Sequence, residues 1–286
     1  MSMGKRLWAA AAMAAATIGA AATATGQATN GAEWRTVAPE NLLVVDTAHG
    51  RVLVELEPRI APRTVAQVRT LADRGFYDGL KFHRVIRDFM AQTGDPLGTG
   101  AGGSDLPDVP GEFSFRRGRE HGFASVLAGP QGQYGLVGSM PVLTQPDAQM
   151  MVTSDFKTGG IALFCPGVLG LARNDDPDSG NSQFFIMTAA NHNLDGDYTA
   201  FGRVVAGLDA VRALKAGAQA ENGRVDSPDL MLRARTAAAM PEAERPVVRV
   251  RSMTHPVQAA EIERVRAERG PRFTVCDIQP AAEVVD

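Results

Sequence analysis

Short apolar segments, each bounded by turn-forming residues, recur through most of residues 42–205. Runs of about four to eight residues rich in β-branched and aromatic side chains are typical of strands. Because a closed sheet has no exposed edge, many short strands favour an antiparallel barrel. The segments that predict strands are residues 42–46, 51–57, 81–86, 88–94, 167–172, 182–189 and 198–205, and the first two form a hairpin through His49 and Gly50.

Two segments in this series have helical periodicity instead. Residues 62–75 place Pro62 in the first turn and Gly75 at the end, where helices favour these residue types. Residues 207–217 predict a second helix. The sequence therefore predicts a mainly β fold, a closed antiparallel barrel with two helices, over residues 40–222.

Two further regions lie outside this plan. Residues 104–166, rich in Gly, Pro, Met and Gln, predict a long, largely irregular insertion, which is uncommon in a compact domain unless it covers something. Residues 223–286 predict a C-terminal α+β extension packed on the barrel. Its expected elements are two strands (230–235 and 246–252), a helix (257–269) and a final strand around 273–278.

The first 28 residues predict a signal peptide. A positive start (MSMGKR) precedes a short, alanine-rich apolar stretch, and the small-residue pattern allows cleavage near Ala24 or near Ala28. An uncleaved anchor is the alternative, although the stretch is short for a membrane span. We therefore expect a periplasmic or secreted protein. Because no later stretch reaches about 18 apolar residues, we expect no membrane insertion of the mature chain.

Export determines how the two cysteines are interpreted. In an oxidising compartment, Cys165 and Cys276 are candidates for a disulfide, and two separate buried thiols are the alternative. The five histidines and two cysteines are scattered without the spacing of metal ligands, so we expect no metal site and no cofactor.

Charge and motifs exclude several other functions. The formal net charge is -3 and no Lys/Arg-rich run occurs, so we expect no nucleic-acid partner. The glycines of GTGAGG (98–103) match a dinucleotide-binding pattern, but the following SDLPDVPG has prolines where a helix should begin. We therefore reject dinucleotide binding.

The segment FHRVIRDFMAQTGDP (82–96) places an arginine inside a strand. If Arg87-Asp88-Phe89 is a turn, Ile86 pairs with Met90 and Arg84 pairs with Gln92. A cation is costly to bury without a partner. Arg84 therefore needs either a structural carboxylate, with Asp88 and Asp95 as candidates, or a groove that accepts the oxygen atoms of a ligand.

Three blocks of the chain, including this one, resemble in order the signature of the cyclophilins, the peptidyl-prolyl cis-trans isomerases. The blocks are FHRVIRDFMAQTGDPLGTGAGG, GVLGLARN with NSQFFIMTA, and NLDGDYTAFGRVVAGLD. The insertion and the extension are similar to those of exported bacterial members. The resemblance implies a closed eight-stranded antiparallel barrel capped by two helices.

The resemblance also implies an activity, the isomerisation of X-Pro bonds, here in exported proteins of the cell envelope. Arg84 matches the catalytic arginine of the family, with Gln92 and Phe89 beside it. Proline-containing polypeptides are the implied partners, and we expect a monomer. The implied substrate-binding residues are His83, Met90, Ala172, Arg173, Gln183, Phe185, Leu194 and Tyr198. The alternative is a weakly catalytic or non-catalytic chaperone or binding module that uses the insertion as its contact surface.

The chain departs from the family pattern at several positions. Many eukaryotic cyclophilins have a tryptophan that helps to bind cyclosporin where this chain has Asn193, so we predict weak cyclosporin binding. Tyr198 replaces a histidine, and the loop that begins at Arg173 is longer and more charged than usual. The insertion enters beside the expected groove and could lengthen, cover or block it.

Overall fold

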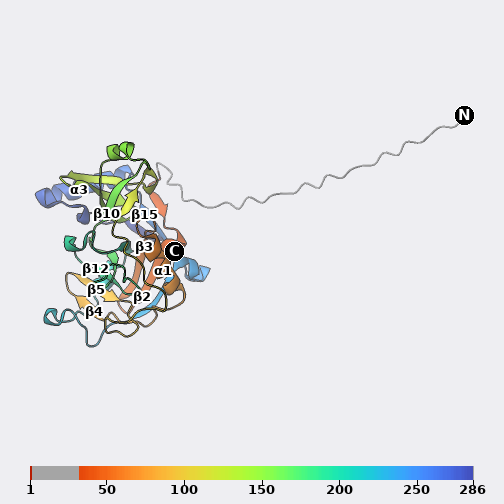
Figure 1. Cartoon of the computed structure of the whole chain (residues 1–286), viewed down its shortest axis with the longest axis vertical. Coiled ribbons are helices and arrows are strands. Elements are labelled where there is room, and N and C mark those ends of the chain that lie inside the picture. Colours follow the sequence, from red (N-terminus) through yellow and green to blue (C-terminus); the bar gives the residue numbers. More distant parts are fainter. Residues whose placement is uncertain (2–31, 286) are drawn as a thin grey trace.

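The structure is a computed structural model that describes Met1 and residues 32–285. The expected signal peptide, with its candidate cleavage sites at Ala24 and Ala28, lies outside the described residues apart from Met1. Figure 1 shows two packed parts: the labels β2, β3, β4, β5 and β12 lie in the lower part, and β10, β15 and α3 lie in the upper part.

The larger part is one curled antiparallel sheet of eight strands, as the resemblance implied. The two edges of the sheet, at Met231–Thr236 and Arg84–Ile86, approach each other. Two hydrogen bonds link the segments there: Gly79 N–H donates to Met231 O (2.7 Å), and Val225 N–H donates to His83 O (3.1 Å). Isolated bridges and loop hydrogen bonds therefore join the edges in place of a continuous ladder. In spatial order the strands are β14 (Met231–Thr236), β2 (Leu42–Thr47), β3 (Gly50–Leu56), β13 (Ala200–Ala206), β11 (Val168–Leu171), β12 (Phe184–Met187), β5 (Met90–Thr93) and β4 (Arg84–Ile86).

Two helices pack on the apolar core of this sheet. Helix α1 (Pro62–Asp73) buries Val65, Val68 and Leu71 on one face, as its periodicity predicted. Helix α2 (Leu208–Arg212) ends earlier than the predicted 207–217. The chain leaves the helix because Lys215 N–H donates to Asp229 Oδ2 (2.8 Å) and Gly217 N–H donates to Val85 O (3.0 Å).

The insertion is not largely irregular, and that prediction was wrong. Most of it folds into a second antiparallel sheet, in which the tight turns Gly129–Gly132 and Val137–Met140 join consecutive strands. The glycines that were interpreted as loop residues lie within or between these strands. In spatial order the strands are β6 (Phe115–Arg117), β10 (Thr158–Ala162), β9 (Met140–Thr144), β8 (Gly132–Val137) and β7 (Ala124–Gly129).

The C-terminal region needs two corrections. Strand β14, expected in the extension, is an edge strand of the eight-stranded sheet, where it pairs with β2. The final strand expected around 273–278 is a short 3-10 turn, Val275–Asp277, because Asp277 Oδ2 accepts the N–H of Thr274 (2.8 Å) and Cys276 is bonded to Cys165. The extension contains the predicted helix as α3 (Pro256–Arg269), and its sheet is β1 (Trp34–Thr36), β15 (Val247–Arg251) and β16 (Ala282–Val285).

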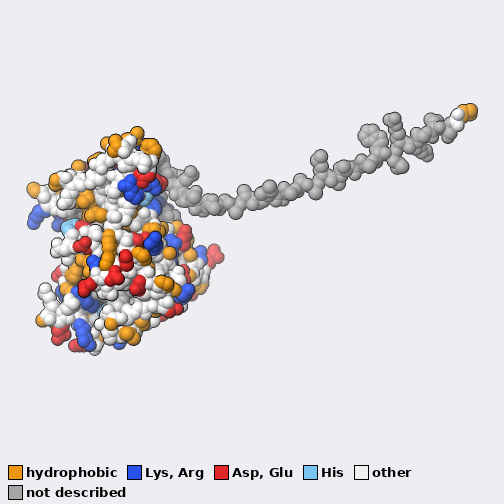
Figure 2. All heavy atoms as spheres, viewed as in Figure 1, with side chains coloured by type: hydrophobic (Ala, Val, Ile, Leu, Met, Phe, Trp, Pro, Cys, Tyr) orange, Lys and Arg blue, Asp and Glu red, His pale blue; other side chains and the backbone are white. Residues whose placement is uncertain are grey.

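Apolar side chains gather at the upper end of the molecule, where the segment Asp147–Val152 lies (Figure 2). Met151, Val152 and Phe156 are exposed there. Among the residues that the structure describes, no helix is long and apolar enough to span a membrane.

Candidate active site

The β4–β5 hairpin has the predicted register. Arg84 pairs with Gln92, and Ile86 pairs with Met90. The turn contains Asp88 in a left-handed conformation (φ 56°), which aspartate tolerates better than most residues. Because cross-strand partners project from the same face, Arg84 and Gln92 lie side by side.

Arg84 has no carboxylate partner among the described residues, so the structural ion pair is not formed. The candidate Asp95 is buried and instead accepts the backbone N–H groups of Leu97 and Thr99 (2.8 and 2.7 Å). The Arg84 guanidinium donates to neutral oxygens: Nε to Asn222 O (2.9 Å), Nη2 to Asn222 Oδ1 (2.8 Å) and Nη1 to Gln92 Oε1 (3.1 Å). Each terminal nitrogen makes one of these bonds and keeps an N–H free for a ligand.

Burial lowers the pKa of Arg84 below its ordinary value. An arginine begins from a value so high that it stays charged at neutral pH. The side chain is therefore a fixed, fully charged donor held by groups that carry no formal charge.

A cavity of about 540 Å³ opens beside Arg84. It brings together residues from β4, β5, β12 and the segments that follow β11 and precede β13. Of the predicted site residues, those that line it are His83, Arg84, Phe89, Met90, Gln92, Ala172, Arg173, Phe185, Leu194 and Tyr198.

Gln183 is the predicted site residue that does not line the cavity. Its Oε1 accepts from Gln92 Nε2 (3.0 Å), and its Nε2 donates to the carbonyls of Gly100 (3.0 Å) and Gly102 (2.8 Å). Gln183 therefore fixes the orientation of the Gln92 amide from behind and ties it to the loop at the cavity rim.

Aromatic packing builds the apolar wall of the cavity. Phe185 stacks on Phe164 (centroids 5.7 Å apart) and meets the edge of Tyr198 (5.8 Å). The ring also lies over its cross-strand partner Gly170, where a Cβ would come within 2.3 Å of it. A side chain at position 170 would displace Phe185, so this glycine shapes the wall.

Two of the predicted cavity residues, Arg173 and His83, are polar. Arg173 lies over the ring of Tyr198 (4.6 Å) and donates to Asp197 O (3.1 Å). His83 is buried, and burial lowers its pKa, so its imidazole is neutral at pH 7.

Sequence reasoning missed one side of the cavity, formed by Glu221, Asn222 and Arg224 and by the glycine-rich loop 98–100. The Asn222-Gly223 dipeptide is a turn signal that could have identified the first segment as a loop. Nothing local could have placed it against Arg84, which lies 138 residues away.

The insertion leaves the cavity open. None of its described residues, 104–166, lines the cavity. Its apolar residues instead share a core with Met90 and Phe185, so the insertion supports the cavity floor from behind.

The fold and the site together define a class of protein: a curled antiparallel β-barrel with one open groove, in which a fixed cation lies beside an apolar wall. Within the described residues, no group of three or more potential ligands could hold a metal ion.

Comparison with known proteins identifies the family. Residues 42–236 match the family model described as cyclophilin type peptidyl-prolyl cis-trans isomerase/CLD. A probable peptidyl-prolyl cis-trans isomerase of Brucella suis is 36% identical over 245 residues, which cover 82% of this chain and 96% of that protein. The peptidyl-prolyl cis-trans isomerase-like 1 of Neurospora crassa is 35% identical over 172 residues, 60% of this chain and 79% of that protein.

A solved structure agrees with these matches. The crystal structure of cyclophilin AquaCyp293 from Hirschia baltica superposes with a TM-score of 0.78 at 33% sequence identity, covering 88% of this chain and 93% of that chain. The chain therefore belongs to the cyclophilin family, and it is a peptidyl-prolyl cis-trans isomerase.

Proposed function

We propose that this isomerase acts on X-Pro bonds of exported proteins and assists their folding in the cell envelope, with Arg84 as its catalytic residue. The observation that carries the catalytic assignment is the geometry of Arg84. Its guanidinium is held by neutral oxygens beside an apolar cavity and keeps N–H groups free.

The chemistry requires only that the twisted amide be stabilised. Rotation about the C–N bond faces a barrier of roughly 20 kcal/mol because amide resonance gives that bond double-bond character. In the twisted state the proline nitrogen becomes pyramidal and can accept a hydrogen bond. A free Arg84 N–H, fixed before the substrate arrives, supplies that bond without reorganisation.

The remaining cavity residues have positioning roles in this proposal. The proline ring lies against Phe89, Met90, Phe185 and Leu194, so it stays fixed while the other side of the bond turns. Gln92 holds the guanidinium and meets the substrate backbone. The backbone of Ala172 and Arg173 forms the edge along which the peptide lies.

Arg84→Ala tests the catalytic assignment. We expect kcat/KM for a prolyl peptide to fall by roughly 10²–10³, the usual cost of losing one such donor. Arg87→Ala is the matched control, because Arg87 is exposed in the same hairpin and does not line the cavity. A protease-coupled assay checks this. Equal activity in the wild type and Arg84→Ala would contradict the assignment of Arg84. Activity absent from the wild type would favour a non-catalytic binding module.

Two features support export. The first 28 residues have the sequence pattern of a signal peptide. Cys165 and Cys276 form a disulfide with Cα atoms 5.0 Å apart, and disulfides persist mainly in oxidising compartments. Cell fractionation with N-terminal sequencing tests this: we expect an envelope or secreted protein that begins at Thr25 or Thr29, and an unprocessed cytosolic chain would refute export.

A further inference from the structure

The cavity carries an excess of positive charge. Arg84, Arg173 and Arg224 line it, and Glu221 is the one carboxylate among the described residues that do so. None of the three arginines has a carboxylate within ion-pair distance in the described part of the chain. The whole chain has a net charge of -3, so the groove is opposite in sign to the molecule that contains it.

Arg224 extends a row of polar side chains that crosses the strands. Gln92 pairs with Arg84 on β5 and β4, and Arg84 forms an isolated antiparallel bridge with Arg224 on its other side. Cross-strand partners project from the same face. Arg84 therefore lies between Gln92 on one side and Arg224 on the other. Its side chain is exposed and makes no hydrogen bond to any described residue.

Arg173, on the other side of the cavity, is already engaged. Its guanidinium donates to Asp197 O (3.1 Å) and Asn174 O (2.8 Å) and lies over the Tyr198 ring. Of the two arginines beside Arg84 in the cavity, Arg224 is therefore the one whose side chain is free to meet an acidic substrate side chain.

We propose that Arg224 makes the groove prefer substrates with Asp or Glu within about two residues of the X-Pro bond, on the side that lies against Arg224. The preference rests on the proposed isomerase site at Arg84. Pairs between exposed charges are weak, so the expected preference for a Glu peptide over its Gln analogue is about 1.5- to 5-fold in kcat/KM.

Exchange NMR without a coupling protease measures this preference. Peptides with a neutral Ala-Pro centre carry Glu or Gln at each flanking position in turn. At about 10 mM salt we expect a ratio above one at one position, falling toward one at about 1 M salt, where charges are screened within about 3 Å. A ratio of one at every position, or a ratio that salt does not change, would overturn the proposal.

Three variants locate the effect. Arg224→Gln should bring the Glu/Gln ratio to one. Glu221→Gln should raise the ratio, because it removes the opposing carboxylate. Arg63→Gln is the control for net charge, since Arg63 is exposed on α1 away from the cavity, and it should leave the ratio unchanged. A ratio that persists in Arg224→Gln would refute the assignment.

Binding separates this inference from the proposed function. The Kd values of the Glu and Gln peptides for the wild-type chain are read from NMR titrations, which need no catalysis. Equal isomerisation of both peptides, with Arg84→Ala inactive, would leave the proposed function intact and refute the charge preference. If no peptide were isomerised, the proposed function would fail. In that case tighter binding of the Glu peptide would still support the role of Arg224, and equal Kd values would refute that role.

Discussion

At the scale of single residues, the catalytic candidate Arg84 depends on partners without formal charge. A carboxylate partner would fix the guanidinium but offset its positive field, whereas the amide and carbonyl oxygens of Gln92 and Asn222 orient it and leave the charge available. Asn222 supplies two of these oxygens from a left-handed backbone conformation (φ 55°). It is therefore a positioning residue for Arg84.

Asn222→Gly tests this role, because glycine adopts the same φ without strain; it removes the side-chain amide and keeps the backbone carbonyl that accepts from Arg84 Nε. Loss of one hydrogen bond of about 0.5–1.5 kcal/mol should lower kcat/KM by roughly 2- to 10-fold, mostly through kcat. Steady-state kinetics, with urea unfolding to confirm an intact fold, check the result. Asn222→Asp keeps an acceptor but adds a charge, so it should also lower kcat. Unchanged kcat in both variants would show that Asn222 only shapes the turn.

Asn193 leads to a prediction about cyclosporin. This residue is exposed beside Leu194 at the cavity, where the resemblance indicated a tryptophan in many eukaryotic members. An asparagine offers little apolar surface to a large apolar ligand. Cyclosporin should therefore inhibit weakly, and Asn193→Trp should strengthen the inhibition. Titrating the drug against isomerase activity measures both, and inhibition of the wild type at low nanomolar concentration would contradict the expectation.

At the scale of elements, the features that could be predicted from the sequence are those that depend on contacts between residues close together in the chain. The β4–β5 hairpin has a short turn, so its register and the Arg84–Gln92 pair followed from the sequence. The partners of Arg84 at Asn222 and the role of β14 did not, because both depend on chain segments far apart in the sequence. The five-stranded sheet was missed because its glycines match loop composition as well as they match tight hairpins.

The short turn Arg119–His121 beside β6 predicts a pH dependence of stability. His121 is buried, and its Nδ1 accepts the N–H of Gly118 (3.1 Å), which requires a neutral ring. Burial lowers the pKa of His121 below its ordinary 6.5. The nearby Glu120 partly opposes this shift, as does the hydrogen bond from Arg59, while the positive charges of Arg59 and Lys157 add to it. As pH falls through 6.5, His121 is protonated in the unfolded chain before it is protonated in the folded chain. The free energy of unfolding should therefore fall over this range.

His121→Asn isolates this effect, because asparagine keeps an acceptor and does not titrate. Urea unfolding at about pH 7.5 and about pH 5.5 should show a smaller loss of stability in the variant than in the wild type. The wild type and the variant must be compared because other groups also titrate. Burial raises the pKa of Glu57, so protonation of Glu57 makes the fold more stable as pH falls and partly masks the effect of His121 in either protein alone. An identical pH dependence in both proteins would refute the role of His121.

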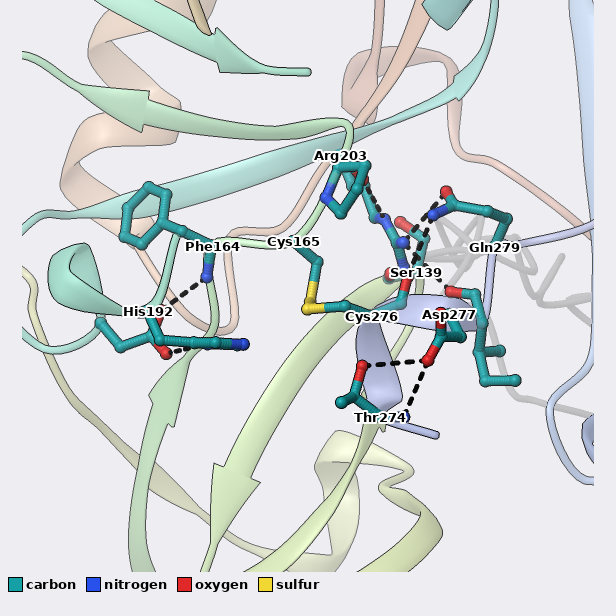
Figure 3. Close-up of a disulfide and its surroundings, with 12 residues drawn as sticks. Ser139, Phe164, Cys165, His192, Arg203, Thr274, Cys276, Asp277 and Gln279 are labelled. Atoms are coloured by element: carbon teal, nitrogen blue, oxygen red, sulfur yellow. Dashed lines mark hydrogen bonds and ion pairs between the residues drawn. A yellow bond between two sulfur atoms is a disulfide. The ribbon is translucent and has the colours of Figure 1, made fainter. Parts of the chain in front are cut away.

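At the scale of the whole molecule, one buried region joins the eight-stranded sheet, the insertion and the extension (Figure 3). Arg203 on β13 is fully buried and donates to Ser139 O (3.0 Å) between β8 and β9 and to Ile278 O (3.1 Å) in the extension. Burial without a carboxylate partner lowers the pKa of Arg203 to about 9, so it remains charged at neutral pH. The charge is tolerated because carbonyl oxygens surround it.

Replacing Arg203 by methionine would leave those carbonyls without a donor. A buried acceptor that loses its partner costs about 1–3 kcal/mol, so Arg203→Met should lower the free energy of unfolding by several kcal/mol. Urea unfolding measures this. Arg212→Met is the control, because Arg212 is exposed and forms a surface ion pair with Asp209 and one long hydrogen bond to Thr188 O (3.5 Å). A loss no larger than that of the control would show that the buried guanidinium does not help to join the three parts.

The disulfide next to Arg203 makes the second link, between Cys165 at the end of the insertion and Cys276 in the extension (Figure 3). It closes a loop between residues 111 positions apart, and in the chain-entropy model such a link stabilises the folded state by about 4–5 kcal/mol. The double substitution Cys165→Ser and Cys276→Ser should lower the free energy of unfolding toward that amount. The wild type in reductant should match it, while the double variant should not respond to reductant. Because Phe164, next to Cys165, stacks on Phe185 in the cavity wall, kcat/KM should be measured on the same samples. If reductant left the stability of the wild type unchanged, the disulfide would not be what holds the extension on the barrel.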